Sequence, residues 1–200
     1  MKFILASASP RRRELLQQIG IKPKVIVSAF AEVSTAQAPQ DLVKANAVGK
    51  GAIVAAQSPR EAVVIAADTV VVLRNEILGK PHDSKHAQAM LTQLSGQKHQ
   101  VLTAVAVFYQ GQQQVTVETT EVEFYPLTQQ QIRAYIVTGE PLDKAGAYGI
   151  QGLGAALVKG IHGSYSNVVG LPLGNLLRML IGMGVIKDDQ LFNQGFSTRG

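Results

Sequence analysis

A carboxylate interrupts an otherwise apolar stretch of this sequence, VIAADTVVVL at residues 64–73. Only two residues in that stretch are polar, Asp68 and Thr69, and they stand side by side at its centre. A carboxylate in apolar surroundings loses favourable hydration unless a cation or hydrogen-bond donors compensate. Two interpretations follow. Either Asp68 has a buried partner and a chemical role, or the pair turns the chain at a strand break and faces water.

Two lysines are candidate partners for this carboxylate. Lys50 falls on the apolar face of a helix predicted at residues 41–56, so its ammonium either snorkels to water or reaches an internal anion. That anion would be Asp68 or a bound phosphate. Lys80 follows a predicted hairpin turn, and it returns close to Asp68 if residues 70–73 pair with the segment after the turn.

The N-terminal segment LASASPRRRELL, at residues 5–16, is typical of a strand, a turn and a helix that begins at Ser9 and Pro10. Three arginines then occupy the first helical turn, where the helix dipole favours acidic residues instead. An anion held by free backbone N–H groups, serine hydroxyls and guanidinium groups would resolve this misfit. We favour that interpretation over arginines that simply point into water.

Other possible motifs are weaker. Neither Gly49-Lys50 nor Gly79-Lys80 continues as a P-loop, and GIQGLG at residues 149–154 follows a loop, unlike a dinucleotide fingerprint. The segment EPLDKAGAYGIQG, at 140–152, is either a long connection or a glycine-rich loop that presents Gln151 to a ligand. A metal site on His82 and His86 is disfavoured, because Ser84 between them is the expected helix N-cap.

The elements that must position these residues alternate between strand and helix patterns, which predicts a mixed sheet in an α/β fold. Strands are predicted at 3–6, 25–28, 63–67, 70–73, 101–108, 115–124 and 155–158. Helices are predicted at 10–19, 41–56, 84–94, 129–137 and 172–181. Gly20, Gly96 and Gly139 follow three of these helices, where a left-handed C-cap is expected.

Composition narrows the class of protein. The chain has 200 residues, 46% hydrophobic and 16% charged, which is typical of a folded globule. It has no cysteine, and its N-terminal apolar run is too short for a signal peptide, so we expect a cytoplasmic protein without a membrane span. We expect one domain at 1–187 and a flexible tail at 188–200. The net charge of +5 suits an anionic partner, but a nucleic-acid surface is poorly supported.

Six ordered blocks of the sequence resemble the Maf family of nucleoside triphosphate pyrophosphatases over residues 5–180. The blocks are LASASPRRRELL, AADTVV, LGKP, LSGQKHQVLTAV, EPLDKAGAYGIQG and SNVVGLPL. The resemblance implies an elongated mixed sheet flanked by helices, with two lobes around a deep nucleotide cleft, as in ITPase-like folds. It also implies a homodimer and a divalent metal cation, normally Mg²⁺.

The resemblance further implies hydrolysis of the bond between the α- and β-phosphates, which yields a nucleoside monophosphate and pyrophosphate. The branch that acts on dTTP and UTP is marked by residues that match Arg12, Thr69 and Gln151. Asp68 matches the catalytic acidic residue. The family's phosphate- and metal-binding groups resemble Ser7, Arg11, Glu32, Lys50 and Lys80.

The expected reaction assigns a role to each of these charged residues. The arginines and lysines would neutralise the phosphates, while Asp68 and Glu32 would hold Mg²⁺ or activate water. The sequence does not decide which carboxylate does which, and our hypothesis makes Asp68 the base. Thr69 and Gln151 would distinguish the carbonyls of uracil or thymine from the amino group of cytosine.

Two alternatives remain. In an aspartyl-phosphate phosphatase Asp68 would be the nucleophile, but a second aspartate is usual two residues later, where this chain has Val70. In a regulator of cell division that binds nucleotide or nucleic acid without turnover, the arginines would bind the ligand, but Asp68 and Lys50 would have no purpose.

Overall fold

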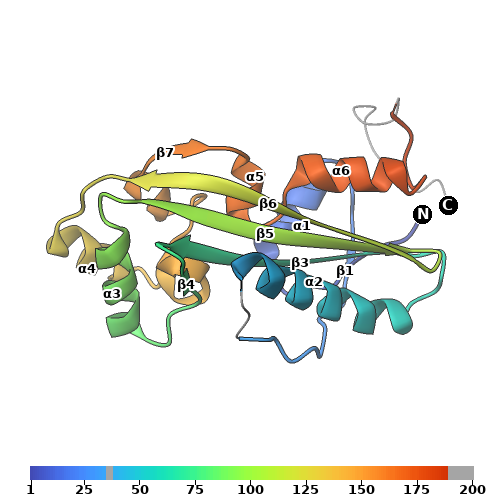
Figure 1. The fold of residues 1–200 in the computed structure, drawn as a ribbon, viewed down its shortest axis with the longest axis horizontal. Helices are drawn as coiled ribbons and strands as arrows, with labels where there is room; N and C mark the ends of the chain where they lie inside the picture. The colour runs from blue at the N-terminus through green and yellow to red at the C-terminus, as the bar shows by residue number, and fades with distance from the viewer. Residues whose placement is uncertain (35–37, 189–200) are drawn as a thin grey trace. The chain divides into compact units, whose positions relative to one another are not determined.

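The computed structural model describes residues 1–34 and 38–188, and within them it is an α/β fold whose mixed sheet is flanked by helices, as predicted (Figure 1). Hydrogen-bonded neighbours follow the order β2-β1-β3-β5-β6-β7, and β4 also pairs with β3. The strands are β1 (Phe3–Leu5), β2 (Lys24–Val25), β3 (Val63–Leu73), β4 (Glu76–Leu78), β5 (Lys98–Tyr109), β6 (Gln112–Phe124) and β7 (Val158–His162). The α-helices are α1 (Pro10–Gln18), α2 (Pro39–Ala56), α3 (Ser84–Leu94), α4 (Gln129–Val137), α5 (Tyr165–Val169) and α6 (Leu173–Gly182). Short 3₁₀ helices are η1 (Glu140–Asp143), η2 (Ala145–Ala147) and η3 (Leu153–Leu157).

The chain forms two compact units. Within the described residues, unit 1 comprises 1–34, 38–68, 103–118 and 170–188, and unit 2 comprises Thr69–Leu102 and Thr119–Val169. Strands β3, β5 and β6 each contribute residues to both units. The expectation of one domain at 1–187 stays a prediction, and residues 189–200 of the expected tail lie outside the described residues.

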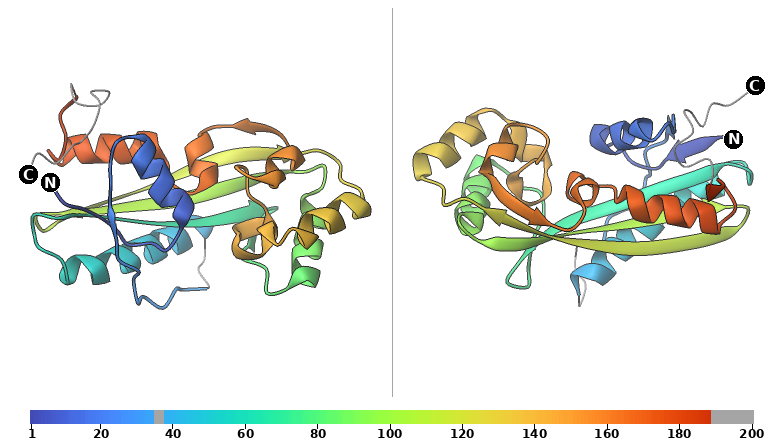
Figure 2. Two further views of the ribbon diagram at one scale, coloured as in Figure 1. Left: turned by 180° about the vertical axis from the view of Figure 1, so that it is seen from behind. Right: turned by 90° about the horizontal axis from the view of Figure 1, so that it is seen from above.

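Unit 1 is built on three parallel strands, since β1 pairs in parallel with both β2 and β3. The continuous burial of β1 and of the first part of β3 follows from layers on both of their faces. On one face Ile4 and Val64 cluster with Val54 of α2. Helices α2 and α6 lie on opposite sides of these strands (Figures 1 and 2). The strands therefore end between helical layers, and Asp68 is the last residue of the unit 1 part of β3.

Unit 2 has a separate core in which α3 and α4 contact each other and pack against the second half of β3. Its central residues include Val71, Leu91, Phe124 and Ile132. The β3–β4 hairpin turns through Arg74 and Asn75, both in the left-handed region at φ 49° and 69°. Such a turn suits a two-residue hairpin, and the antiparallel register that results sets Val71 opposite Leu78.

Most of the predicted elements are present, because their signals are local. The five predicted helices are found, and Gly20, Gly96 and Gly139 have the expected positive φ values of 82°, 66° and 75°. The hypothesis of a strand break at Asp68 is wrong, since β3 runs through it without interruption.

One predicted strand is also wrong. Residues 155–158 belong mainly to η3, and the strand β7 starts only at Val158. The physical reason is local hydrogen bonding: the N–H of Ala155 donates to the carbonyl of Gly152 at 3.1 Å, and the N–H of Val158 donates to the carbonyl of Ala155, so neither N–H pairs with a neighbouring strand. Near the N-terminus, only Val25 of the strand predicted at 25–28 lies in a strand, because β2 comprises Lys24–Val25.

Within the described ranges, no helix combines the length and the apolar character that crossing a membrane requires.

Candidate active site

In unit 1, Asp68 is buried at 8% exposure and has a cationic partner. The Lys50 ammonium lies 2.7 Å from Asp68 Oδ1 and 2.6 Å from Glu32 Oε1. The Lys50 side chain is only 12% exposed, whereas that of Glu32 is 57% exposed. Lys50 therefore joins a buried carboxylate to one that faces solvent, and the snorkelling interpretation of Lys50 is wrong.

Helix α2 places Lys50 at this position. Val43, Ala47 and Val54 share its face of the helix and are fully buried, so the lysine continues the apolar stripe toward β3. Glu32 comes from the segment 26–34, which has no regular secondary structure. This segment approaches α2 where Gly49 has no side chain, because a Cβ there would overlap the ring of Phe30.

Asn46, which the sequence analysis did not single out, links the Asp68 carboxylate to the backbone of Val33, the residue after Glu32. It is 3% exposed, and its Nδ2 donates to Asp68 Oδ2 at 3.1 Å and to the carbonyl of Val33 at 3.1 Å. Its Oδ1 accepts the N–H of Val33 at 2.8 Å. One buried amide thus fixes both Asp68 and the residue that follows Glu32. Its position one helical turn before Lys50 was the available signal.

The arginine-rich turn lies at the same place in unit 1. Arg12 donates from Nη1 to Ser7 Oγ at 3.0 Å and from Nε to the carbonyl of Gly170 at 2.8 Å. Burial lowers the pKa of Arg12, the carboxylate of Asp68 opposes that shift, and the neighbouring Arg11 lowers the pKa further. Ser9 is the N-cap residue of α1 as predicted, although its side chain makes no capping hydrogen bond.

Unit 1 therefore brings together six of the predicted site residues: Ser7, Arg11, Arg12, Glu32, Lys50 and Asp68. In chemical terms, cationic groups and a serine hydroxyl surround two carboxylates that share an ammonium ion. Such a set can neutralise a polyphosphate and retain a base for water activation.

The donor set can also be compared with the needs of a divalent cation. No three His, Asp or Glu side chains gather into a metal-binding group in the described part of the chain. However, Asp68 and Glu32 oxygens converge on one cation already, the ammonium of Lys50. Mg²⁺ is commonly held by one or two carboxylates, waters and substrate phosphates. Asp68 and Glu32 fit that role.

The other predicted residues belong to unit 2. Thr69 is the first residue of its part of β3, and the β3–β4 pairing ends at Val71 and Leu78. Lys80 is exposed and lies two residues after the end of β4, beyond that pairing. The carbonyl of Gly79 accepts the N–H of Gly146 at 3.0 Å, so η2 lies beside this hairpin. Gln151 is exposed, in the loop between η2 and η3.

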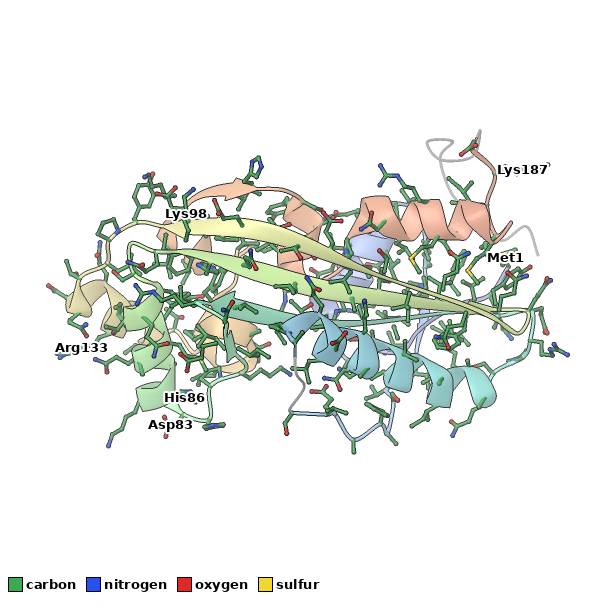
Figure 3. The ribbon with its side chains drawn as sticks, viewed as in Figure 1. Met1, Asp83, His86, Lys98, Arg133 and Lys187 are labelled. Carbon is green, nitrogen blue, oxygen red and sulfur yellow. The ribbon has the colours of Figure 1, made fainter. Side chains whose placement is uncertain are left out.

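The histidine pair in unit 2 has a structural role. Asp83, and not Ser84, is the N-cap of α3, and its carboxylate accepts the N–H of His86 at 2.7 Å. Figure 3 shows Asp83 and His86 at that end of α3. The His82 and His86 rings lie 4.5 Å apart, and the backbone N–H of His82 donates to His86 Nδ1. These contacts stabilise the start of the helix.

Comparison with known proteins decides the family. The sequence profile described as "Maf-like protein" matches residues 2–183. The chain belongs to the Maf family.

Curated relatives from the Maf family match nearly the whole chain. The dTTP/UTP pyrophosphatase of Halalkalibacterium halodurans is 50% identical over 178 residues, which cover 89% of this chain and 94% of the relative. The dTTP/UTP pyrophosphatase of Symbiobacterium thermophilum is 50% identical over 184 residues, 92% of this chain and 94% of the relative. The dTTP/UTP pyrophosphatase of Deinococcus radiodurans is 49% identical over 184 residues, which cover 92% of this chain and 94% of the relative.

Proposed function

We propose that this chain hydrolyses dTTP and UTP to the nucleoside monophosphate and pyrophosphate. Support comes from two sides. Relatives that bear the name dTTP/UTP pyrophosphatase are about half identical over nine-tenths of the chain. The observation that carries the proposal is the buried Asp68, held by Lys50 and Asn46 beside Arg12 and Ser7.

Charge neutralisation is the main task of such a site. The reaction consumes one water, breaks the anhydride bond between the α- and β-phosphates, and releases two anionic products. Arg11 and Arg12 would bind phosphate oxygens with guanidinium donors, and Lys50 and Lys80 would supply compact ammonium charges. The Ser7 hydroxyl, already a partner of Arg12, would complete the phosphate contacts.

In this proposal Asp68 is the general base. Lys50 and Asn46 each donate to a different oxygen of its carboxylate, which keeps the group oriented and leaves further lone pairs to accept a proton from water. Fixing the base in this way lowers the reorganisation needed in the transition state.

A divalent cation, Mg²⁺ in the first instance, would be held by Glu32 and Asp68. When bound it would neutralise charge on the phosphate oxygens. Glu32 is the more exposed of the two ligands, so it can turn toward an incoming Mg²⁺–nucleotide complex. Lys50 would then keep contact with Asp68 and gain phosphate oxygens as partners.

Thr69 and Gln151 would determine the choice of base in this proposal. A hydroxyl and a carboxamide can donate to carbonyl oxygens of uracil or thymine, and a donor there meets the amino group of cytosine unfavourably. We further propose that the protein acts as a homodimer on free nucleotides and not on nucleic acid.

Product analysis tests the proposal. The protein is incubated with dTTP, UTP, CTP and GTP plus Mg²⁺, alongside Asp68→Asn and the matched control Asp41→Asn, an exposed residue in the first turn of α2. We expect pyrophosphate from dTTP and UTP, loss of at least about 100-fold in Asp68→Asn, and little change in the control.

Other products would contradict the proposal. Release of orthophosphate would indicate a phosphatase. Binding of nucleotides without turnover by the folded protein would support the regulator, which is the alternative function.

A further inference from the structure

The loop that carries Gln151 rests on a tyrosine and a glutamate. In unit 2, the Tyr135 hydroxyl donates to Glu140 Oε1 at 2.9 Å and accepts the N–H of Gly149 at 3.1 Å. Glu140 Oε2 accepts the N–H of Leu153 at 2.9 Å, and Oε1 accepts the N–H of Gly154 at 3.1 Å. Backbone groups on both sides of Gln151 are thus fixed by these two side chains, which we call the Tyr135–Glu140 clamp.

The glycines of this loop let its backbone close on the clamp. A Cβ at Gly152 would overlap the Glu140 carboxylate, and a Cβ at Gly154 would overlap the Tyr135 hydroxyl. At Gly149 a Cβ would meet the stem of Lys144, whose ammonium donates to the carbonyl of Glu140 at 2.6 Å. These glycines therefore serve close approach of the loop to side chains beneath it.

The clamp and Gln151, the residue whose backbone it holds, differ in their exposure to solvent. Tyr135 is 6% exposed and Gly154 is buried, whereas Gln151 is exposed. Hydrogen bonds to an ionised carboxylate are stronger than those between neutral groups, and here Glu140 accepts three of them. The exposed Gln151 side chain therefore projects from a loop whose backbone is held by hydrogen bonds on both sides.

We propose that Glu140, together with Tyr135, is a positioning residue that orients Gln151 for recognition of the pyrimidine base. This inference rests on the proposed hydrolysis of dTTP and UTP and adds a specificity element to it. A prefixed carboxamide discriminates between bases, because it cannot swing to accommodate the amino group of cytosine. Releasing the loop lets the same glutamine adapt to either base, so discrimination falls.

The central variant is Glu140→Gln. It keeps the size of the side chain, but the amide offers one acceptor oxygen, and its NH₂ group then faces a backbone N–H. Tyr135→Phe removes the hydroxyl from the other side of the clamp. The matched control is Glu121→Gln, which loses the same charge from an exposed ion pair with Lys98 on unit 2.

We expect the ratio of kcat/KM for dTTP to that for CTP to fall about tenfold in Glu140→Gln, through a higher KM for dTTP and a lower KM for CTP. Tyr135→Phe should change the ratio in the same direction, and Glu121→Gln should leave it unchanged. In a Gln151→Ala background, Glu140→Gln should have no further effect on the ratio, because both changes remove one interaction. Hydrogen exchange of residues 149–154 should speed up in both clamp variants and not in the control.

The outcomes separate this inference from the proposed function. An active wild-type protein whose loop exchanges faster in Glu140→Gln, with an unchanged dTTP to CTP ratio, would overturn the positioning role alone. Equal effects of Glu140→Gln with and without Gln151 would also overturn it. A wild-type protein that releases no pyrophosphate from dTTP or UTP would overturn the proposed function itself.

Discussion

At the scale of single residues, the candidate active site depends on buried charge that is fully compensated. The Asp68 carboxylate receives Lys50 on one oxygen and Asn46 on the other. Removing one partner from such a group costs more free energy than forming the pair contributes, because the remaining group stays buried without compensation. Substitutions here should therefore affect both folding and chemistry.

Asn46→Ala tests this compensation. The change removes the donor to Asp68 Oδ2 and both hydrogen bonds to the Val33 backbone. We expect about 2–4 kcal/mol less stability against urea, and a fall in kcat of about tenfold or more as the base loses its orientation. The control is Asn175→Ala on α6, a partly exposed residue that donates to Glu118. A normal kcat in Asn46→Ala would exclude a positioning role.

His99 should make stability depend on pH. Burial lowers its pKa from 6.5 to about 4, and the ring shares a 2.8 Å hydrogen bond with the Tyr148 hydroxyl. The unfolded chain takes up the proton near pH 6.5 and the folded chain only near pH 4. The stability that comes from neutral His99 is thus complete above pH 6.5 and is lost as the pH falls toward 4, by roughly 3 kcal/mol.

Urea unfolding between pH 8 and pH 4 measures this effect. His99→Gln, which keeps a partner for Tyr148 but cannot titrate in this range, should flatten the slope between pH 6.5 and 4 by up to about 1.4 kcal/mol per pH unit. An equal slope in wild type and His99→Gln would contradict the assignment.

At the scale of elements, α2 packs closely against its neighbours because two of its residues, Gly49 and Gly51, have no side chain. Gly49 leaves space for the Phe30 ring, and Gly51 leaves space for the Phe108 ring. Glycine lowers helix stability by about 1 kcal/mol relative to alanine, so close packing is the reason for both residues. The segment that carries Glu32 approaches Lys50 through the Gly49 gap.

Gly49→Ala should therefore impair activity although alanine is the better helix former. The new Cβ would displace Phe30, and with it the segment 26–34 and Glu32, so we expect KM for the Mg²⁺–nucleotide complex to rise about tenfold. The double variant Gly49→Ala with Phe30→Ala should recover part of the loss, since the overlap is gone. Gly174→Ala on α6, where the nearest atom is 3.6 Å from the added Cβ, is the control.

At the scale of the whole molecule, the two units share strands, which bears on cooperativity. Strands β3, β5 and β6 each begin in one unit and end in the other. A unit that unfolded alone would break the ladders of all three strands part-way along their length. We therefore expect one cooperative transition, in keeping with the single domain predicted at 1–187.

Peptide-resolved hydrogen exchange at increasing urea concentration checks this prediction. Peptides from α2 in unit 1 and from α4 in unit 2 should lose protection at the same midpoint. Two midpoints separated by about 1 M urea or more would show that the units unfold independently, and the prediction of a single domain would then be wrong.

The amino-acid sequence by itself determined the local features of this protein and pointed to its family. The start of α1 at Pro10, the left-handed caps at Gly20, Gly96 and Gly139, and the β3–β4 turn all depend on residues a few positions apart. Helical periodicity likewise put Lys50 on the buried face of α2. Such signals are readable because backbone conformation responds to neighbouring residues in the chain.

Only the tertiary structure decided which partners these residues have. Lys50 meets Asp68 across 18 residues of sequence, and Asn46 meets it across 22, because α2 packs on β3. The same holds for Glu140, whose carboxylate accepts backbone N–H groups 13 and 14 residues away, at the start of η3. Contacts over such distances depend on how elements pack, and no local pattern records which polar group will meet which.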